Sequence, residues 1–245
     1  MGSLKKWVST LLIAFCIMSV FAPEAFAKAN KGVMIKMKCP VAVDAETDNS
    51  LQYFVGALQK KKTRATKNMK VSCTIYIPTG ALKEKGDFVI FDPMTYLTDG
   101  KQVYGTIFSK RNVQLELAGS KKKPTLYWQA DDGVGAKLKS KNGTVKKKKG
   151  FYVVKLKKIP LCDWAFERTP DTRIDIKTDK NVYLSTQVRI YRRGSKAWTG
   201  NVFVDDLTIH AKKTLKMKFD KKDYKEVFCY KFTDETVKAK VKKIK

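Results

Sequence analysis

Two adjacent carboxylates lie in an apolar, alternating segment at residues 200–210. Successive side chains of a strand point to opposite faces, so Phe203, Asp205 and Leu207 are expected to share one face. A carboxylate that faces a protein core is costly unless it is paired or bound to a cation. The alternative is that one carboxylate of the pair, Asp205 or Asp206, faces solvent and the other lies at a bulge, because an alternating strand usually shows one face to water.

A second acidic group, at residues 44–48, could complete a metal site. Asp44, Glu46 and Asp48 stand at every second position, and calcium takes oxygen ligands from carboxylates and backbone carbonyls. If Asp205 faces inward, a structural calcium held by Asp205 and Glu46 would offset the cost of burying it. This segment lacks the glycine and the distant glutamate of an EF-hand loop, and a solvated acidic turn is the simpler interpretation of it alone.

Aromatic and amide side chains alternate along two further segments and could together bind a sugar. Aromatic rings stack on the apolar face of a sugar, while amides and guanidinium groups form hydrogen bonds with its hydroxyls. The candidate carbohydrate-binding residues are Tyr127, Gln129, Gln187, Arg189, Tyr191 and Trp198. We expect the first five on one sheet face and Trp198 at a loop rim. The alternative is that the tyrosines are ordinary half-buried aromatics, which strands favour.

Motifs of catalysis are missing from the chain. His210 is the one histidine, and it follows a strand with no nucleophile or metal partner placed near it by sequence. The chain has no Gly-x-Ser-x-Gly, no phosphate-binding glycine-rich loop and no signature that sets two carboxylates facing each other. We therefore expect a protein that is not an enzyme.

The elements expected to position these residues are strands. Apolar residues alternate with polar ones in short segments separated by turn signals, and no segment keeps a helical period over ten residues except weakly around residues 51–60. The expected strands include residues 33–39, 69–78, 88–91, 102–108, 113–117, 124–130, 151–156, 173–177, 182–191 and 200–210. Many short strands with frequent turns predict an all-β fold, either a sandwich or a closed barrel.

The segment from Arg189 to His210 resembles the C-terminal hairpin of jelly-roll carbohydrate-binding modules of the galactose-binding-like kind. Their last strand typically reads apolar-x-apolar-Asp-Asp/Asn-apolar after a glycine, as residues 200–207 do here, and Ile77-Pro78 before Gly80 looks like an early strand of the same modules. The resemblance covers roughly residues 69–210 and implies a two-sheet antiparallel β-sandwich. In many such families the first aspartate of the pair helps to hold a structural calcium, which implies this role for Asp205.

The N-terminus predicts export. Lys5 and Lys6 precede an apolar run at residues 11–21, and Ala25-Phe26-Ala27 forms a small-x-small cleavage site. We therefore expect a signal peptide at residues 1–27 and a secreted or periplasmic protein without a transmembrane segment. The expected sandwich covers residues 28–212, and residues 213–245 are expected to form a basic C-terminal extension.

The charge balance is strongly basic. The chain has 51 Lys and Arg against 23 Asp and Glu, a formal net charge of +28. The lysines occur in short runs between the expected strands, so they are expected in turns, where they usually serve solubility. Our leading hypothesis is a glycan-binding protein that recognises a polysaccharide or cell-envelope glycan. The alternative is a basic surface protein whose lysine-rich loops bind an anionic polymer, and no motif indicates specific nucleic-acid binding.

Four cysteines follow the predicted signal peptide, at Cys39, Cys73, Cys162 and Cys229. An even number in an exported chain allows two disulfides in three possible pairings. The absence of a Cys-x-x-Cys pair and the single histidine argue against zinc. Because chain ends often lie close together, we predict a disulfide between Cys39 and Cys229, with the other two paired or buried.

Overall fold

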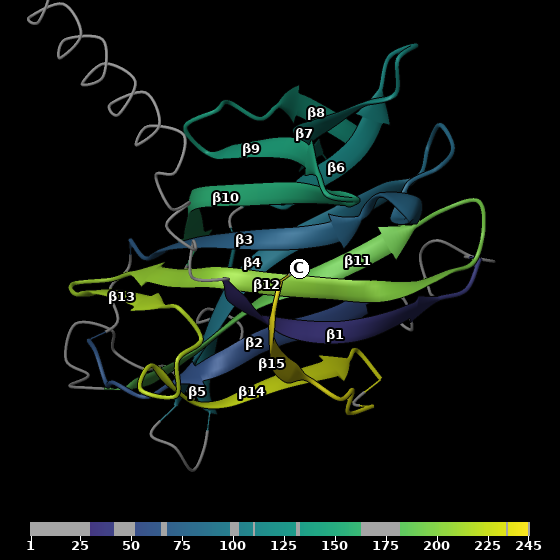
Figure 1. Cartoon of the computed structure of the whole chain (residues 1–245). Coiled ribbons are helices and arrows are strands. Elements are labelled where there is room, and N and C mark those ends of the chain that lie inside the picture. The colour runs from purple at the N-terminus through teal and green to yellow at the C-terminus, as the bar shows by residue number, and fades with distance from the viewer. Residues whose placement is uncertain are drawn as a thin grey trace, which may run out of the picture. The chain divides into compact units, whose positions relative to one another are not determined.

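The computed structural model describes residues 30–41, 52–64, 68–98, 103–109, 111–130, 133–162, 182–233 and 235–244. These residues form two antiparallel sheets that pack against each other as a β-sandwich (Figure 1). Within the described ranges there is one short 3-10 turn, Thr79–Ala81, and no α-helix. The all-β, two-sheet antiparallel fold predicted from the alternating segments is confirmed.

One sheet, called sheet A here, lies toward the viewer in Figure 1. Its strands run in the order β9, β10, β3, β12, β1, β15, and β13 pairs with the second half of β12. Their bounds are β9 Gly143–Lys148, β10 Phe151–Cys162, β3 Lys70–Pro78, β12 Trp198–His210, β1 Lys31–Cys39, β15 Lys240–Lys243 and β13 Thr214–Met217.

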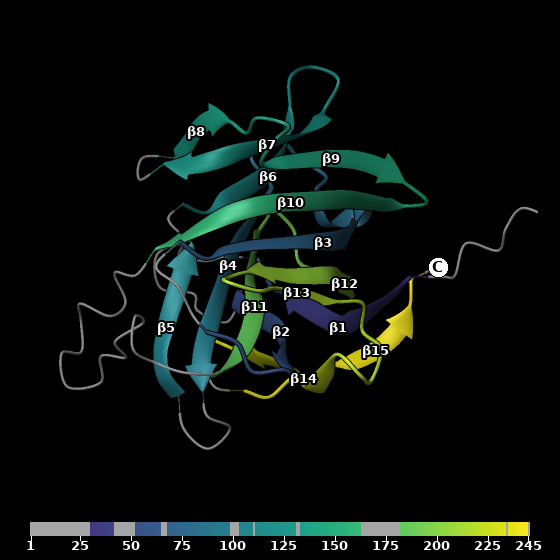
Figure 2. The same cartoon turned by 90° about the vertical axis from the view of Figure 1, so that its left-hand side faces the viewer.

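The second sheet, sheet B, lies behind sheet A in Figure 1 and beside it in Figure 2. Its strands are β14 Tyr224–Lys231, β2 Gln52–Gln59, β11 Tyr183–Arg193, β4 Phe88–Thr98, β5 Val103–Ser109, β6 Val113–Ala118, β7 Lys123–Ala130 and β8 Gly133–Lys137. They pair in that order, except that β4 pairs along one edge with both β5 and β6. The end of β10 also pairs with β5, which joins the two sheets at one edge.

The core lies between the sheets and follows the period of two. In β3 the residues Val71, Cys73, Ile75 and Ile77 are at most 2% exposed, and they belong to one apolar cluster that includes Val188 of the facing sheet. The shared face predicted for these four residues of β3 is confirmed. The alternate residues of both sheets point away from this cluster and form two outer faces.

The C-terminal part of the chain belongs to the sandwich. Residues 213–245 were expected as an extension, but they contribute β13 and β15 to sheet A and β14 to sheet B. The compact unit therefore runs over Lys31–Ile244 rather than ending at residue 212. The predicted signal peptide at residues 1–27 lies outside the described residues.

A bulge in β12 separates the two adjacent carboxylates. The register between β12 and β3 shifts between Asp205 and Thr208, and Asp206 adopts a positive φ of 51°. Because a bulge inserts one extra residue, the alternation reverses after it, and Leu207 is fully buried in the core cluster. The prediction that Leu207 shares a face with Phe203 and Asp205 is wrong. The alternative is correct for the bulge, at which Asp206 lies, but Asp205 is 2% exposed and does not face solvent.

The predicted Cys39–Cys229 disulfide is not present in the structure, in which both residues carry thiols. Cys39 at the end of β1 and Cys229 on β14 are both buried near Tyr53, whose hydroxyl lies 2.9 Å from the backbone N and O of Lys38. Burial raises the pKa of the Cys229 thiol to about 12, although nearby Lys231 opposes the shift. The first strand and the tail therefore meet as expected, but in an environment that keeps this thiol protonated.

Candidate functional site

Six residues form one row across the outer face of sheet A, which we call the central row. In strand order the central row is Lys146, Val153, Tyr76, Phe203, Met34 and Lys240. Each member is the register partner of the next, although the members come from six separate strands. Neighbouring strands lie about 4.8 Å apart, so the row spans about 24 Å. A lysine therefore stands at each end of an apolar and aromatic stretch.

Aromatic rings pack edge to face at the middle of this face. The ring of Phe151 lies 6.3 Å from that of Tyr76, with an interplanar angle of 85°. It also lies 6.0 Å from the ring of Phe203, at 78°. Phe203 is 8% exposed and stands outside the core cluster, while Tyr76, Phe151 and Met34 are half-buried. The face therefore offers partly accessible ring surface to a ligand.

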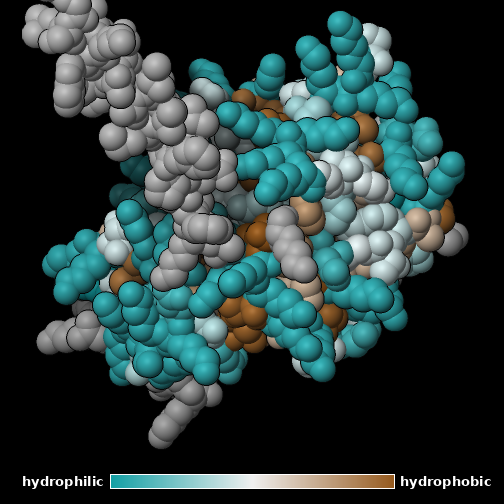
Figure 3. Space-filling model, in the orientation of Figure 1, coloured by the Kyte–Doolittle hydropathy of each residue, from teal (hydrophilic) through white to brown (hydrophobic). Residues whose placement is uncertain are grey.

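Lysines border the aromatic centre on both sides. These border lysines are Lys36, Lys38, Lys146, Lys148, Lys155, Lys240 and Lys242. All are exposed, and no carboxylate of the described chain lies within ion-pair distance of any of them. Figure 3, which shows the molecule from this side, has apolar side chains near the middle and hydrophilic ones around them. The border lysines keep their full positive charge available to a partner.

The carboxylates of β12 remove little of this charge. Asp205 is 2% exposed, and its Oδ1 accepts a 2.7 Å hydrogen bond from the backbone N–H of Asp206. Burial, together with the neighbouring charge of Asp206, raises the pKa of Asp205 to about 6. Asp206 itself is paired with Lys218, and their hydrogen bond raises the pKa of that lysine. Neither carboxylate faces a border lysine as a partner.

The predicted calcium site is not tested by the structure. Within the described ranges no group of three or more His, Cys, Asp or Glu side chains gathers as a metal site. Glu46, the second predicted ligand, lies outside the described residues. Asp205 already uses one oxygen in its bond to the backbone of Asp206. Calcium at Asp205 and Glu46 therefore stays a prediction.

The predicted sugar-binding residues gather on the outer face of sheet B, with one exception. Tyr127 and Tyr191 belong to one cross-strand row with Gln114 and Ile90 between them. Gln129 stands two positions from Tyr127, and Gln187 and Arg189 precede Tyr191 at alternate positions of β11. The prediction that these five side chains share a face agrees with the structure.

Trp198 lies on sheet A instead, so the prediction that it stands at the loop rim of the same sugar site is wrong. It begins β12 of sheet A, opposite Cys39 of β1, and it packs against the core cluster. Its ring lies 5.9 Å from the guanidinium carbon of Arg192. The segment that was expected to be a loop rim is therefore part of the strand, and the indole faces into the sandwich edge.

Polar groups on the outer face of sheet B bind one another. Arg189 forms a 3.1 Å ion pair with Asp92 and donates a 3.3 Å hydrogen bond to the side-chain oxygen of Gln52. Ser109 donates a 2.6 Å hydrogen bond to Asp92. Asp92 is 4% exposed, and burial raises its pKa in spite of Arg189 and Ser109, which both lower it. We call these four residues the buried polar network.

A second group of aromatics lies beside this network, since Phe54 is the register partner of Arg189. Phe54 stacks on Tyr230 with 4.8 Å between ring centroids and an interplanar angle of 5°. The side-chain amide of Gln187 donates a 3.2 Å hydrogen bond to the Tyr230 hydroxyl, and Gln187 is fully buried. The amides of Gln129 and Asn112 lie 2.9 Å apart. Most of the groups that were predicted to form hydrogen bonds with a sugar therefore form them with other protein groups.

Sequence reasoning missed the central row. Lys146 was interpreted as a turn lysine and Lys240 as part of a basic C-terminal extension, but both lie in edge strands of sheet A. Their signal was the alternation around them, such as Lys240-Val241-Lys242, in which the lysines share one face of a strand. Tyr76 and Phe203 were expected in strands, but no role was given to them.

Comparisons with known proteins give no family for this chain. No family model matches it, and no curated protein matches it. Among solved structures it is similar to the crystal structure of the tailspike protein of Acinetobacter baumannii phage AM24, at 12% identity and a TM-score of 0.22. The similarity covers 64% of this chain and 30% of that one, and a score this low does not establish a shared fold. The resemblance to jelly-roll carbohydrate-binding modules stays a prediction.

No helix among the described residues is long and apolar enough to cross a membrane.

Proposed function

We propose that this protein binds an acidic polysaccharide without catalysis, and that the outer face of sheet A is its binding surface. The observation that carries this proposal is the central row, in which Lys146 and Lys240 flank Tyr76 and Phe203 across six paired strands. A sugar ring has an apolar face that packs on aromatic side chains. A carboxylate or sulfate on the sugar meets the ammonium group of a border lysine.

The charge distribution supports a polymer rather than a single small anion. The net charge is +28, and the border lysines spread part of it over one sheet face. Salt screens the interaction between charges that lie more than about 10 Å apart. Like charges that lie within about this distance of one another therefore add their attraction for the same partner. An extended chain that carries repeated negative charges can satisfy several border lysines at once. This favours an acidic polysaccharide over a neutral one as the glycan that is bound.

The polar face of sheet B supports a neutral glycan less well. Arg189 and Asp92 would have to give up bonds to each other before binding a sugar hydroxyl, and Gln187 is fully buried. An exchange of protein–protein for protein–sugar hydrogen bonds gains little free energy. Tyr127, Gln129 and Tyr191 remain partly exposed, so they are the predicted residues of this second surface that a sugar could still reach.

The test is a binding panel at two salt concentrations. Polygalacturonate and a sulfated polysaccharide represent acidic polymers, amylose represents neutral ones, and single-stranded DNA represents nucleic acid. We expect binding to the acidic polysaccharides that weakens strongly from about 50 mM to about 300 mM salt, because exposed charge pairs are screened. Salt-independent binding to amylose would contradict the proposal. Binding to DNA that is tighter than to every acidic polysaccharide would assign the face to nucleic acid instead.

A further inference from the structure

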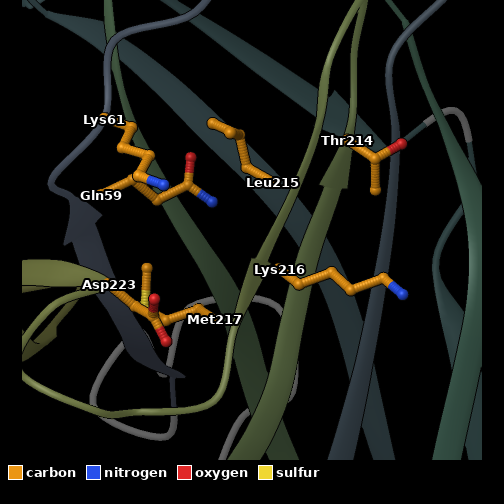
Figure 4. Close-up of a pocket in the computed structure, with 7 residues that line it drawn as sticks. All are labelled: Gln59, Lys61, Thr214, Leu215, Lys216, Met217 and Asp223. Atoms are coloured by element: carbon orange, nitrogen blue, oxygen red, sulfur yellow. The ribbon is translucent and has the colours of Figure 1, made fainter.

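A pocket opens where the end of β2 lies close to β13. It has a volume of about 120 Å³ (Figure 4). Its lining residues are Gln59, Lys61, Thr214, Leu215, Lys216, Met217 and Asp223. The pocket is separate from the central row and from the buried polar network, since it shares no residue with either. Its volume suits a molecule of a few heavy atoms rather than a polymer segment.

Gln59 is the unusual residue of this pocket. Its side chain is 2% exposed, and neither the nitrogen nor the oxygen of its amide has a hydrogen-bond partner in the described structure. An unsatisfied buried polar group destabilises the fold, whereas a leucine of similar size would carry no such penalty. Figure 4 shows the amide pointing into the space that Lys61 and Leu215 border. A polar ligand that reaches this amide would give both of its atoms a partner.

Charges of both signs stand around that amide. In Figure 4 the ammonium group of Lys61 lies on the same side as the Gln59 amide, and Asp223 lies across from them beside Met217. Asp223 accepts a 3.3 Å hydrogen bond from the backbone N–H of Lys218 through Oδ2, which leaves Oδ1 for another donor. Leu215 and Met217 add apolar surface. The pocket therefore combines one cation, one anion and one amide that both donates and accepts.

We propose that this pocket binds a small zwitterion of the α-amino acid class. Its carboxylate accepts hydrogen bonds from Lys61 and from the Gln59 side-chain nitrogen. Its ammonium group donates to the Gln59 side-chain oxygen and to Asp223. An apolar side chain packs against Leu215 and Met217. A zwitterion gives each polar group of the pocket a partner of opposite character, which a simple anion or a neutral diol does not.

This site is independent of the proposed polysaccharide binding, and its test uses the whole protein without any polymer. Each common α-amino acid is titrated by isothermal calorimetry at millimolar concentration, and the melting temperature is recorded in parallel. Propionate and propylamine serve as probes that carry only the carboxylate or only the ammonium group. We expect at least one apolar amino acid to bind and to raise the melting temperature by mass action, and the two probes to bind at least about tenfold more weakly.

Two variants separate recognition from folding. Gln59→Leu removes both amide atoms at nearly constant volume, so we expect it to fold with an unchanged or higher melting temperature and to lose at least about tenfold in amino-acid affinity. Lys213→Gln is the matched control, because Lys213 is an exposed lysine next to β13 that does not line the pocket, and we expect unchanged affinity. If no amino acid binds, or if Gln59→Leu binds as well as the original chain, the pocket holds water only and the proposal is wrong.

Discussion

The two outer faces of the sandwich differ in how available their charged side chains are to a partner. On sheet A the border lysines are exposed and have no carboxylate of the described chain within ion-pair distance. On sheet B the charged pair Arg189 and Asp92 is largely buried, and each member is bonded to the other. Both faces come from the same alternating pattern, so the pattern alone does not distinguish a binding surface from a structural one.

The difference shows that the availability of a group matters more than its chemical type. Gln187 and Arg189 have the side chains that a sugar site would use, but their hydrogen bonds are made within the protein. Lys146 and Lys240 have ordinary surface side chains, but sheet pairing brings them into one row with partly accessible ring surface between them. A polar side chain without a partner in the protein can gain a hydrogen bond or ion pair when a ligand binds. A side chain that already has such a partner only exchanges one interaction for another.

The largest expected effect is a loss of stability when the buried polar network of sheet B is broken. Arg189→Met leaves the Asp92 carboxylate buried without its cation, and we expect the free energy of unfolding to fall by about 3 kcal/mol. Urea denaturation measures this change. Arg193→Met is the matched control, because Arg193 is exposed at the end of the same strand, and its change should stay within about 0.5 kcal/mol. A loss below about 1 kcal/mol for Arg189→Met would mean that the network is not structural.

The next effect concerns Asp205 at the bulge of β12. Its pKa of about 6 in the folded protein exceeds the usual value of about 3.9, so the folded state keeps its proton to higher pH than the unfolded state does. This group therefore stabilises the fold fully below about pH 4, and its contribution is lost as the pH rises through 6. Asp205→Asn should remove that dependence and raise stability at pH 7 by about 1 kcal/mol.

Urea denaturation of both proteins at several pH values between 4 and 7 measures this effect. Asp220→Asn is the control, since it also neutralises a carboxylate of the fold, but one that lies in a partly exposed ion pair with Lys31. Parallel stability curves for Asp205→Asn and the original chain would contradict the account of the bulge carboxylate.

The smallest effect is the one expected on polymer binding when the polar face of sheet B is changed. Tyr127→Ala combined with Gln129→Ala removes the partly exposed groups of the predicted sugar site. Because sheet A is the proposed surface, affinity for polygalacturonate should change by less than about 0.3 kcal/mol. Calorimetric titration decides this. A weakening of about tenfold or more would return the binding site to sheet B.

The fold was predictable because its signal is local. Residues 69–78 alternate without interruption, and the structure buries Val71, Cys73, Ile75 and Ile77 as that period requires. The bulge in β12 was not fixed by the pattern, because no glycine marks it and Asp206 takes the positive φ itself. The expectation for Leu207 failed for that reason alone.

The candidate site was predictable only in part, because it depends on which strands pair. Alternation placed Gln187, Arg189 and Tyr191 on one face, but it could not show that Asp92 of another strand would bind Arg189. In the same way, nothing near Lys146 indicates that Lys240 lies in the same cross-strand row. Sheet topology sets such partners, and it arises from the packing of the whole chain.

The most direct test of the central claim compares two variants that lose the same charge from different places. One variant changes four border lysines of sheet A to glutamine. These are Lys36, Lys146, Lys155 and Lys240. The other changes four exposed lysines in or near turns away from that face to glutamine. These are Lys85, Lys121, Lys123 and Lys137. Each variant is titrated with polygalacturonate at about 50 mM salt.

The account predicts that the sheet A variant loses at least about tenfold in affinity, since four charge contacts of about 0.4 kcal/mol each are removed. The turn variant should change by less than about twofold, because its lysines act only through the long-range field. Equal losses in the two variants would contradict the claim, since binding would then depend on net charge and not on the central row.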